Sequence, residues 1–249
     1  MKKRADLLLV EKNFAETRSK AQAMIMAGQV SVDGKIINKS GENLLSTSNI
    51  KISNLYPKWV SRGALKLLHA IQIFNIEVKN FICLDLGAST GGFSEVLLKY
   101  GAKKIYSVDV GTNQLHENLK KNKKIINIEK TNARYLSDAI ICEKVDLIVC
   151  DVSFISMKKV IEPCLSFLKN KSGMIVGLIK PQFEVSKNEI QKGGIILSSI
   201  IHKRICDDFE NWFDQKLKMK VIGITQSPIK GPKGNIEFLI VAKFRLDIS

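Results

Sequence analysis

The stretch CLDLGASTGGFSEVLL, Cys83 to Leu98, decides the fold of most of this chain. An apolar run opens it, a glycine-rich turn follows, and the rest has the apolar spacing of a helix. Gly87, Gly91 and Gly92 let the backbone turn sharply and let a ligand lie against it. Because a helix start also favours negative charge, we expect a binding loop at the end of a buried strand.

Strands and helices alternate on both sides of this loop, over residues 62–249. A helix is expected over residues 63–74, and strand-like runs occur at FICLDLG, KIYSVDV, IINIEKT, VDLIVCDV, GMIVGLIK, KVIGITQS and IEFLIVAKF. This pattern predicts an α/β fold, with a mostly parallel sheet and helices on both faces. The last two runs leave no room for a helix between them and should form an antiparallel hairpin at one edge. Seven strands ending in this way are the arrangement of the Rossmann-like S-adenosylmethionine-dependent methyltransferases.

The loop also indicates which cofactor is bound. Its spacing does not fit a dinucleotide fingerprint, but Asp85 and the glycines resemble the first methyltransferase motif, D-x-G-x-x-x-G-G-F. The resemblance implies that Asp85 and the loop backbone hold the methionine part of S-adenosylmethionine. Asp109, at the end of the second strand, would accept hydrogen bonds from the ribose hydroxyls of the cofactor. Asn132 either contacts the adenine edge or is a turn residue. The predicted cofactor-binding residues are Asp85, Gly87, Ser89, Thr90, Gly91, Gly92, Phe93, Asp109, Val110, Asn132 and Asp151.

Four charged residues stand at the ends of predicted elements. Lys66 lies in the first helix, Asp151 ends the fourth strand, Lys180 ends the fifth, and Glu237 begins the last. Ligands of such sheets bind at the carboxyl ends of the parallel strands, so Asp151 and Lys180 should be neighbours there. Glu237 enters from the same edge and Lys66 can reach across. The four residues form either a catalytic group or ordinary salt bridges at a sheet edge.

The Lys–Asp–Lys–Glu set resembles that of the FtsJ-like ribose 2′-O-methyltransferases. With SRGALKL, CDVSFIS, KPQFEV and GPKGNIEFL, the chain is similar to the TlyA family of ribosomal RNA methyltransferases, called hemolysins in older naming. The resemblance implies methylation of a cytidine in 23S rRNA, and also in 16S rRNA for longer members; this chain looks like the shorter form. Lys180 would accept the hydroxyl proton, with Lys66 as second cation. Glu184, nearby, either supports the turn or is solvated.

Residues 1–54 form a different unit, which precedes a linker at 55–62 and the methyltransferase domain at 63–249. Two short amphipathic helices are followed by strands around Asp33-Gly34, a hairpin signal. Thr17 is placed to open the second helix and Gly28 to close it. The pattern resembles the RNA-binding domain named after ribosomal protein S-four, although a helical cap with a solvated basic face is the alternative. The predicted RNA-binding residues are Lys3, Arg4, Arg18, Lys20, Lys35 and Arg62.

The formal net charge of +15 favours a polyanionic partner, nucleic acid before an anionic membrane, although AT-biased coding alone produces lysine-rich chains. We expect ribosomal RNA or a ribosomal subunit as partner and a monomeric protein. Five irregularly spaced cysteines and three scattered histidines indicate no metal site. The apolar run in MKKRADLLLV is too short for a signal peptide, so the cytoplasm is expected. A membrane-active hemolysin and a non-catalytic ribosome-assembly factor are the alternative functions.

Overall fold

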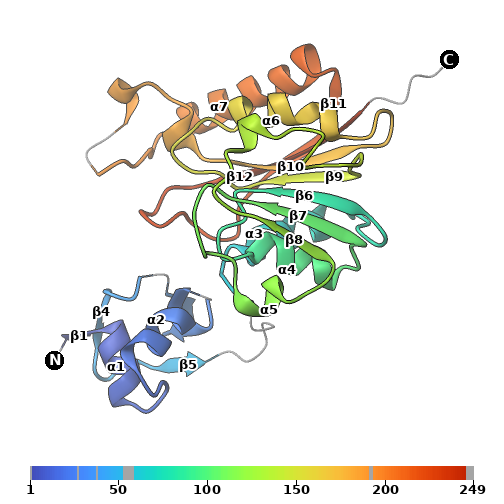
Figure 1. Ribbon diagram of the computed structural model, residues 1–249. Helices are drawn as coiled ribbons and strands as arrows, with labels where there is room; N and C mark the ends of the chain where they lie inside the picture. The colour runs from blue at the N-terminus through green and yellow to red at the C-terminus, as the bar shows by residue number, and fades with distance from the viewer. Residues whose placement is uncertain (1, 27, 38, 53–58, 191–192, 245–249) are drawn as a thin grey trace. The chain divides into compact units, whose positions relative to one another are not determined.

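A computed structural model describes residues 2–26, 28–37, 39–52, 59–190 and 193–244 (Figure 1). The chain divides into two compact units, Met1–Gly63 and Ala64–Ser249. The predicted linker at 55–62 lies outside the described residues as far as residue 58. The two units are described separately below.

The first unit has the predicted order of helix, helix and hairpin. Helices α1 (Ala5–Glu11) and α2 (Arg18–Met26) pack on each other, and β2 (Val30–Val32) pairs with β3 (Lys35–Ile36). Three strands were not predicted. They are β1 (Lys2–Arg4), which pairs with β4 (Asn43–Leu45), and β5 (Ile50–Ile52), which pairs with β2.

Local sequence signals account for the bounds of these elements. The Thr17 hydroxyl accepts a hydrogen bond from the Lys20 amide at 3.1 Å, which caps α2 as predicted. Gly28 closes the same helix in the left-handed region, with φ of 70°. Asp33 and Gly34 both have positive φ, the conformation that a tight hairpin turn requires. The buried side chains of this unit then form their own core.

The second unit contains the predicted seven-stranded sheet. Its spatial order is β11-β12-β10-β9-β6-β7-β8, and β12 runs antiparallel to both of its neighbours, β10 and β11, while the other neighbouring strands are parallel. The last two strands form the expected hairpin, with β12 inserted beside β10. The strands are β6 (Ile82–Leu86), β7 (Lys104–Val108), β8 (Ile125–Ile128), β9 (Leu147–Cys150), β10 (Met174–Ile179), β11 (Met219–Gln226) and β12 (Phe238–Phe244).

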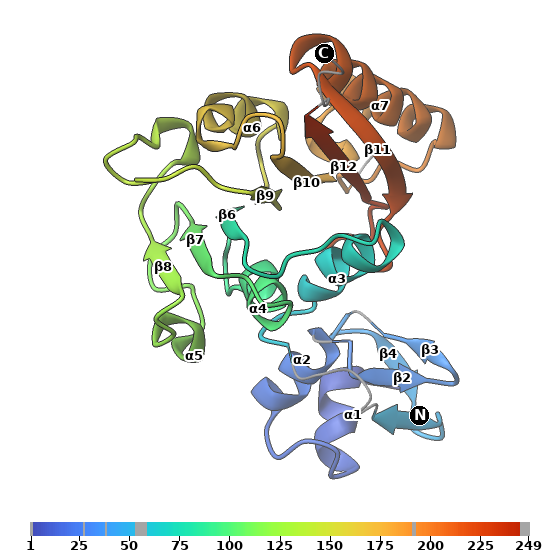
Figure 2. The same cartoon turned by 90° about the vertical axis from the view of Figure 1, so that its right-hand side faces the viewer.

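Helices cover both faces of this sheet, as Figure 2 shows. Helices α3 (Ala64–Ile73) and α4 (Gly92–Lys99) lie on one face. Helices α6 (Lys158–Cys164) and α7 (Ser199–Asn211) lie on the other, and the short α5 (Glu117–Lys120) follows β7. The central strands are therefore buried on both sides, and the residues of β9 are fully enclosed.

Charged residues gather where the central strands end. Asp151 and Lys180 directly follow β9 and β10, and these two strands are parallel neighbours. Strand β12 runs the opposite way and starts at this edge, with Phe238 paired to Ile179. Glu237, just before Phe238, therefore enters beside Lys180. The sheet topology brings three of the four predicted catalytic residues to one edge.

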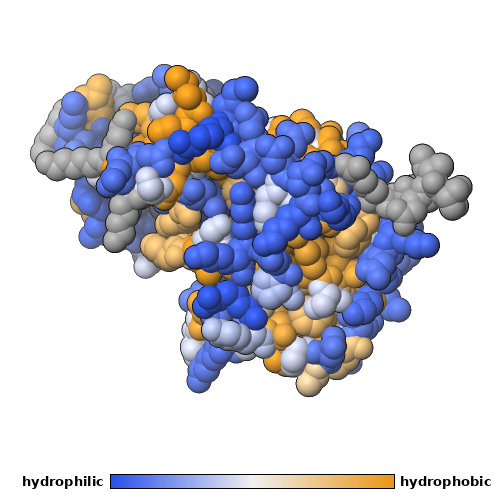
Figure 3. Space-filling model, turned by 90° about the horizontal axis from the view of Figure 1, so that it is seen from above, coloured by the Kyte–Doolittle hydropathy of each residue, from blue (hydrophilic) through white to orange (hydrophobic). Residues whose placement is uncertain are grey.

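Hydrophilic side chains cover much of the molecule's face seen from above Figure 1, with hydrophobic groups between them (Figure 3). Among the residues that the structure describes, no helix is long and apolar enough to cross a membrane.

Candidate active site

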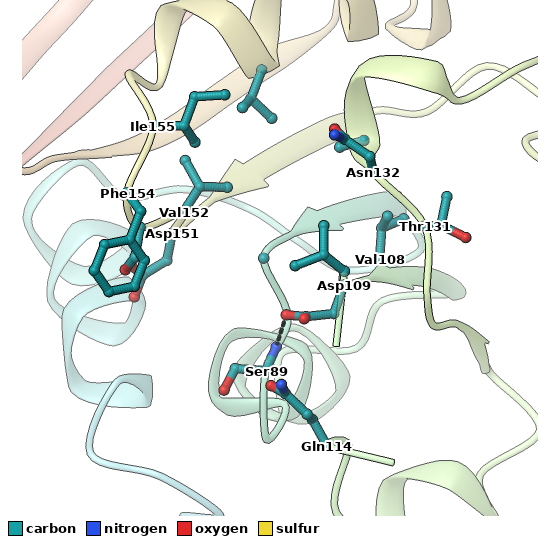
Figure 4. A pocket seen from close by; sticks show the side chains of 15 residues that line it. Ser89, Val108, Asp109, Gln114, Thr131, Asn132, Asp151, Val152, Phe154 and Ile155 are labelled. Atoms are coloured by element: carbon teal, nitrogen blue, oxygen red, sulfur yellow. Dashed lines mark hydrogen bonds between the residues drawn. The ribbon is translucent and has the colours of Figure 1, made fainter. Parts of the chain in front are cut away.

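A cavity of about 400 Å³ opens at the carboxyl ends of the parallel strands (Figure 4). This volume falls within the roughly 300–1,000 Å³ of small-molecule sites. Its walls are mostly apolar, with a few polar groups from the ends of β6, β7, β8 and β9. The lining residues are Gly87, Ser89, Val108, Asp109, Val110, Gln114, Thr131, Asn132, Ala133, Asp151, Val152, Ser153, Phe154, Ile155 and Val160.

Asp109 is the acidic group fixed on the cavity wall after β7. Its carboxylate accepts hydrogen bonds from the backbone amides of Ser89, at 2.8 Å, and Gly111, at 2.7 Å. The first bond ties the β6 loop to the β7 loop, as Figure 4 shows. Across the same cavity, Asn132 caps a short 3-10 turn by accepting from the Arg134 amide. Both polar groups are therefore held in fixed orientations before any ligand binds.

Two of the predicted glycines serve different purposes. Gly87 lines the cavity with φ of 83°, and a Cβ there would lie 2.7 Å from the Asp151 carbonyl oxygen. Gly91 precedes α4, and a Cβ there would overlap the side chains of Leu115 and Leu119. Gly87 thus allows the loop after β6 to approach the Asp151 backbone closely beside the cavity. Gly91 allows the α5 region to pack against the same loop.

Asp85 lies away from the cavity wall, because it is inside β6 rather than after it. Its side chain is fully buried and accepts a hydrogen bond from the Ser94 hydroxyl at 2.6 Å. Its Oδ1 atom has no hydrogen-bond partner among the described residues. Burial raises the pKa of Asp85 to about 7, further helped by the nearby charge of Asp151.

The structure therefore brings six of the eleven predicted cofactor residues to the cavity: Gly87, Ser89, Asp109, Val110, Asn132 and Asp151. Thr90, Gly92 and Phe93, like Asp85 and Gly91, are not part of its lining. Phe93 is a buried core residue of α4, and the carbonyl of Thr90 accepts from the His116 amide.

Lys66, Asp151, Lys180 and Glu237 form one connected cluster of ion pairs. Lys180 Nζ lies 2.6 Å from Asp151 Oδ1, and Lys66 Nζ lies 3.4 Å from Asp151 Oδ2. Lys66 Nζ also lies 2.8 Å from Glu237 Oε2. Asp151 is thus shared by both lysines and belongs to the cavity as well. The side chains are at most 19% exposed, so these charges are poorly screened by water.

The two ends of this cluster differ in their surroundings. Lys180 also donates to the Ser153 hydroxyl at 2.7 Å. Burial alone would lower the pKa of Lys66, but the carboxylates of Asp151 and Glu237 outweigh it and raise that pKa. Burial would raise the pKa of Asp151, yet the two lysines lower it. Lys66 is therefore kept as a cation and Asp151 as an anion.

Phe154 is a site feature that the sequence reasoning missed. Its side chain is 91% exposed, lines the cavity and stacks at a tilt on Phe183, with 5.3 Å between ring centroids. Its φ of 66° is a conformation that costs a bulky residue about 1–3 kcal/mol. The available signal was the CDVSFIS stretch, in which an aromatic residue follows Asp151 by three positions.

Two of the predicted RNA-binding residues, Arg4 and Arg18, contact a different buried carboxylate, which lies in the first unit. Asp6 is fully buried and accepts from Arg4 Nε and Nη2, from Arg18 Nε and from Gln22 Nε2, all at 2.8–3.0 Å. The Leu7 amide supplies a fifth bond. The Arg4 side chain holds the pKa of Asp6 well below its usual range, against the effect of burial, and Gln22 and Arg18 add to this. Arg4 and Arg18 remain 42% and 53% exposed, so both guanidinium groups also face water.

Of the other predicted RNA-binding residues, Lys3, Lys20 and Lys35 carry cations that reach the surface. Lys3 and Lys20 form ion pairs with Glu11 and Glu16. Lys35 is exposed on β3, and Arg62 is half-buried just before α3. Exposed pairs of this kind contribute little to stability and leave the cations available to an anionic partner.

Comparison with known proteins agrees with this arrangement of two units. Residues 59–244 match the FtsJ-like methyltransferase family, and residues 3–49 match the S4 domain. A solved structure of a hemolysin-named protein from Streptococcus thermophilus is 37% identical with a TM-score of 0.74, covering 98% of this chain and 89% of that one.

Two curated relatives are similar over nearly the whole length. Hemolysin A of Brachyspira hyodysenteriae is 42% identical over 95% of this chain and 98% of its own. The 16S/23S rRNA (cytidine-2′-O)-methyltransferase TlyA of Mycobacterium tuberculosis is 38% identical over 98% of this chain and 91% of its own. The chain therefore belongs to the TlyA/hemolysin A family, whose larger unit is an FtsJ-like methyltransferase.

Proposed function

We propose that this protein transfers a methyl group from S-adenosylmethionine to the ribose 2′-hydroxyl of a cytidine in ribosomal RNA. The observation that carries the proposal is the Lys66–Asp151–Lys180–Glu237 cluster beside the cavity. The Mycobacterium tuberculosis relative and a 37% identical relative from Campylobacter jejuni carry 23S rRNA (cytidine-2′-O)-methyltransferase in their names. We therefore propose 23S rRNA as the first target.

The residues around the cavity fit S-adenosylmethionine. Gly87 lines the cavity, and the absence of a side chain there lets the loop after β6 contact the Asp151 backbone and so keeps Asp151 at the cavity wall. Asp109 offers a fixed carboxylate for ribose hydroxyls, and Asn132 offers an amide to the adenine edge. Val108, Val152 and Val160 supply apolar contact for a purine ring. These residues would hold the cofactor, which supplies a methyl group on a positively charged sulfur.

The charged cluster can perform the proton transfer that this reaction needs. When the cofactor supplies its methyl group to the ribose oxygen, Lys180 in its neutral form would accept the proton that the 2′-hydroxyl loses. Asp151 and Ser153 orient the Lys180 amine, since each lies within 2.7 Å of Nζ. Lys66 stays cationic between Asp151 and Glu237 and stabilises the oxygen as it gains negative charge. Alignment of the reacting atoms by these fixed groups supplies the rest of the rate.

Recognition of RNA is assigned to two places. The exposed ring of Phe154 offers an apolar face on which an unstacked base can lie beside the catalytic cluster. The Arg4 and Arg18 guanidinium groups of the first unit offer donors to phosphates. Both features suit a single-stranded or looped nucleotide in a large structured RNA.

The proposal is tested by incubating the purified protein with tritiated S-adenosylmethionine and ribosomal subunits from a host that lacks the modification. We expect label in 23S rRNA, at a cytidine that then resists alkaline cleavage on its 3′ side. Label in a base, or no label together with leakage of liposomes, would overturn the proposal. Label in 16S rRNA alone would correct its target.

A further inference from the structure

The segment Lys180–Glu184 holds the loop that carries Phe154 at both ends. At the first end, the Lys180 amine contacts Asp151 and Ser153. At the other end, Glu184 Oε1 accepts a hydrogen bond from the Met157 amide at 3.0 Å. The loop 151–157 is thus anchored to one short segment on either side of Phe154.

The segment itself is rigid. Pro181 is buried and begins a single 3-10 turn, Pro181–Phe183, which is closed by the Phe183 and Glu184 amides donating to Lys180 and Pro181 carbonyls. Phe183 projects from this turn onto the ring of Phe154. The distance between Lys180 and Glu184 is therefore fixed by the turn, and both ends of the loop are positioned by it.

Burial raises the pKa of Glu184, while the hydrogen bond from the Met157 amide and the nearby charges of Lys158 and Lys159 act against this shift. Its hydrogen bond comes from the backbone amide of Met157, directly before α6. Met157, the residue it holds, is buried and packs on Gly177 of β10, where a Cβ would overlap the Met157 sulfur. The far end of the loop is therefore attached to the sheet through Met157 and to the catalytic segment through Glu184.

We propose that Glu184 is a positioning residue: it holds loop 151–157 so that Phe154 keeps its left-handed backbone and presents its ring beside Asp151 and Lys180. The proposal rests on the proposed function, because the ring is presented to the RNA substrate. It also explains how an exposed, bulky residue persists with φ of 66°. Neighbouring structure must fix such a conformation, and the two anchors do so.

The test is a double-mutant cycle with Glu184→Ala and Phe154→Ala, measured as kcat and KM for ribosomal subunits. Without the Glu184 anchor, the Phe154 ring is no longer held in one position beside Asp151 and Lys180. We therefore expect Glu184→Ala to raise KM about tenfold, since a small misplacement of a substrate-positioning group has a large effect. The double variant should be no worse than Phe154→Ala alone, because Glu184 acts through Phe154. Glu184→Gln, whose amide oxygen can accept the same hydrogen bond from the Met157 amide, should restore most of the wild-type KM. Additive effects of the two alanine substitutions would overturn the proposal.

A second measurement does not depend on RNA. Hydrogen exchange of the free protein should show faster exchange of the Met157 amide and of loop 151–157 in Glu184→Ala than in wild type. Glu162→Ala is the matched control, since Glu162 is exposed on α6 and pairs only with Lys216 among the contacts of the described residues. Unchanged exchange in the loop overturns the role of Glu184 even if methyl transfer is confirmed. Faster exchange in a protein that methylates no ribosomal RNA would support the anchor and reject the proposed function instead.

Discussion

Each unit of this protein buries a carboxylate among cations, but the two clusters are built differently. In the first unit, Asp6 receives five hydrogen bonds, and its two arginines reach out to water. In the second, Asp151 is shared by two enclosed lysines, and Glu237 Oε1 has no hydrogen-bond donor among the described residues. A saturated carboxylate fixes its cations in place. An unsaturated cluster can still exchange a proton or accept a hydroxyl, as a catalytic site must.

The largest effect is expected from the unsaturated cluster. Lys180→Ala removes the proposed proton acceptor, so turnover should fall by ~10³, within the range of general-base catalysis. Cofactor affinity should stay close to wild type, because Lys180 is not part of the cavity lining. Single-turnover transfer of a tritiated methyl group measures the first effect and calorimetry the second. Lys203→Ala, on an exposed α7 lysine, is the control, and a normal rate in Lys180→Ala would refute its role as base.

Two backbone amides fix the Asp109 carboxylate in place. Replacing this residue is expected to lower the affinity for the cofactor. Asp109→Ala removes the acceptor of the Ser89 and Gly111 amides and a group on the cavity wall. Losing hydrogen bonds to a charged group costs about 1.5–3 kcal/mol, so affinity for S-adenosylmethionine should fall about ten- to hundredfold. Calorimetry with the exposed Asp138→Ala as control measures this. Equal affinity in both variants would remove Asp109 from the site.

The sequence predicted some residues of the cavity and the charged cluster correctly and others not, and the difference has a physical reason. Asp151 and Lys180 directly follow two parallel apolar strands, and Glu237 precedes an antiparallel strand that starts at the same edge, so the sequence allowed their proximity to be inferred. Asp85 and Asp109 look alike in sequence, but Asp85 lies one residue before its strand ends and its side chain enters the packed layer. Side-chain direction at that point depends on tertiary packing. Phe154 was missed because an aromatic residue ordinarily indicates core, and its positive φ leaves no sequence signal.

Asp85 is a third buried carboxylate, to be compared with Asp6 and Asp151. It accepts a hydrogen bond from one hydroxyl, and burial raises its pKa to about 7. The unfolded chain loses this proton near pH 4, whereas the folded protein keeps it until about pH 7, so ionisation lowers stability as pH rises through that window. Asp85→Asn cannot ionise. Its melting temperature should exceed that of wild type by a few degrees more at pH 8 than at pH 4, with Asp138→Asn showing no such trend. A constant difference would contradict the raised pKa; titration with S-adenosylmethionine tests the predicted contribution of Asp85 to cofactor binding.

The smallest effect is expected from replacing Asp6. It distinguishes the contribution of guanidinium orientation to RNA affinity from the contribution of net charge. Asp6→Asn raises the net positive charge by one, so electrostatics alone predicts tighter RNA binding. We expect the opposite, because the Arg4 and Arg18 guanidinium groups lose the anion that orients them and must be ordered on binding. Affinity for ribosomal subunits should fall severalfold, with a slope of log affinity against log salt near that of wild type. Arg18→Ala is the matched variant, since it should weaken binding and also reduce that slope by about 1. Tighter binding by Asp6→Asn would mean that the saturated carboxylate serves stability alone.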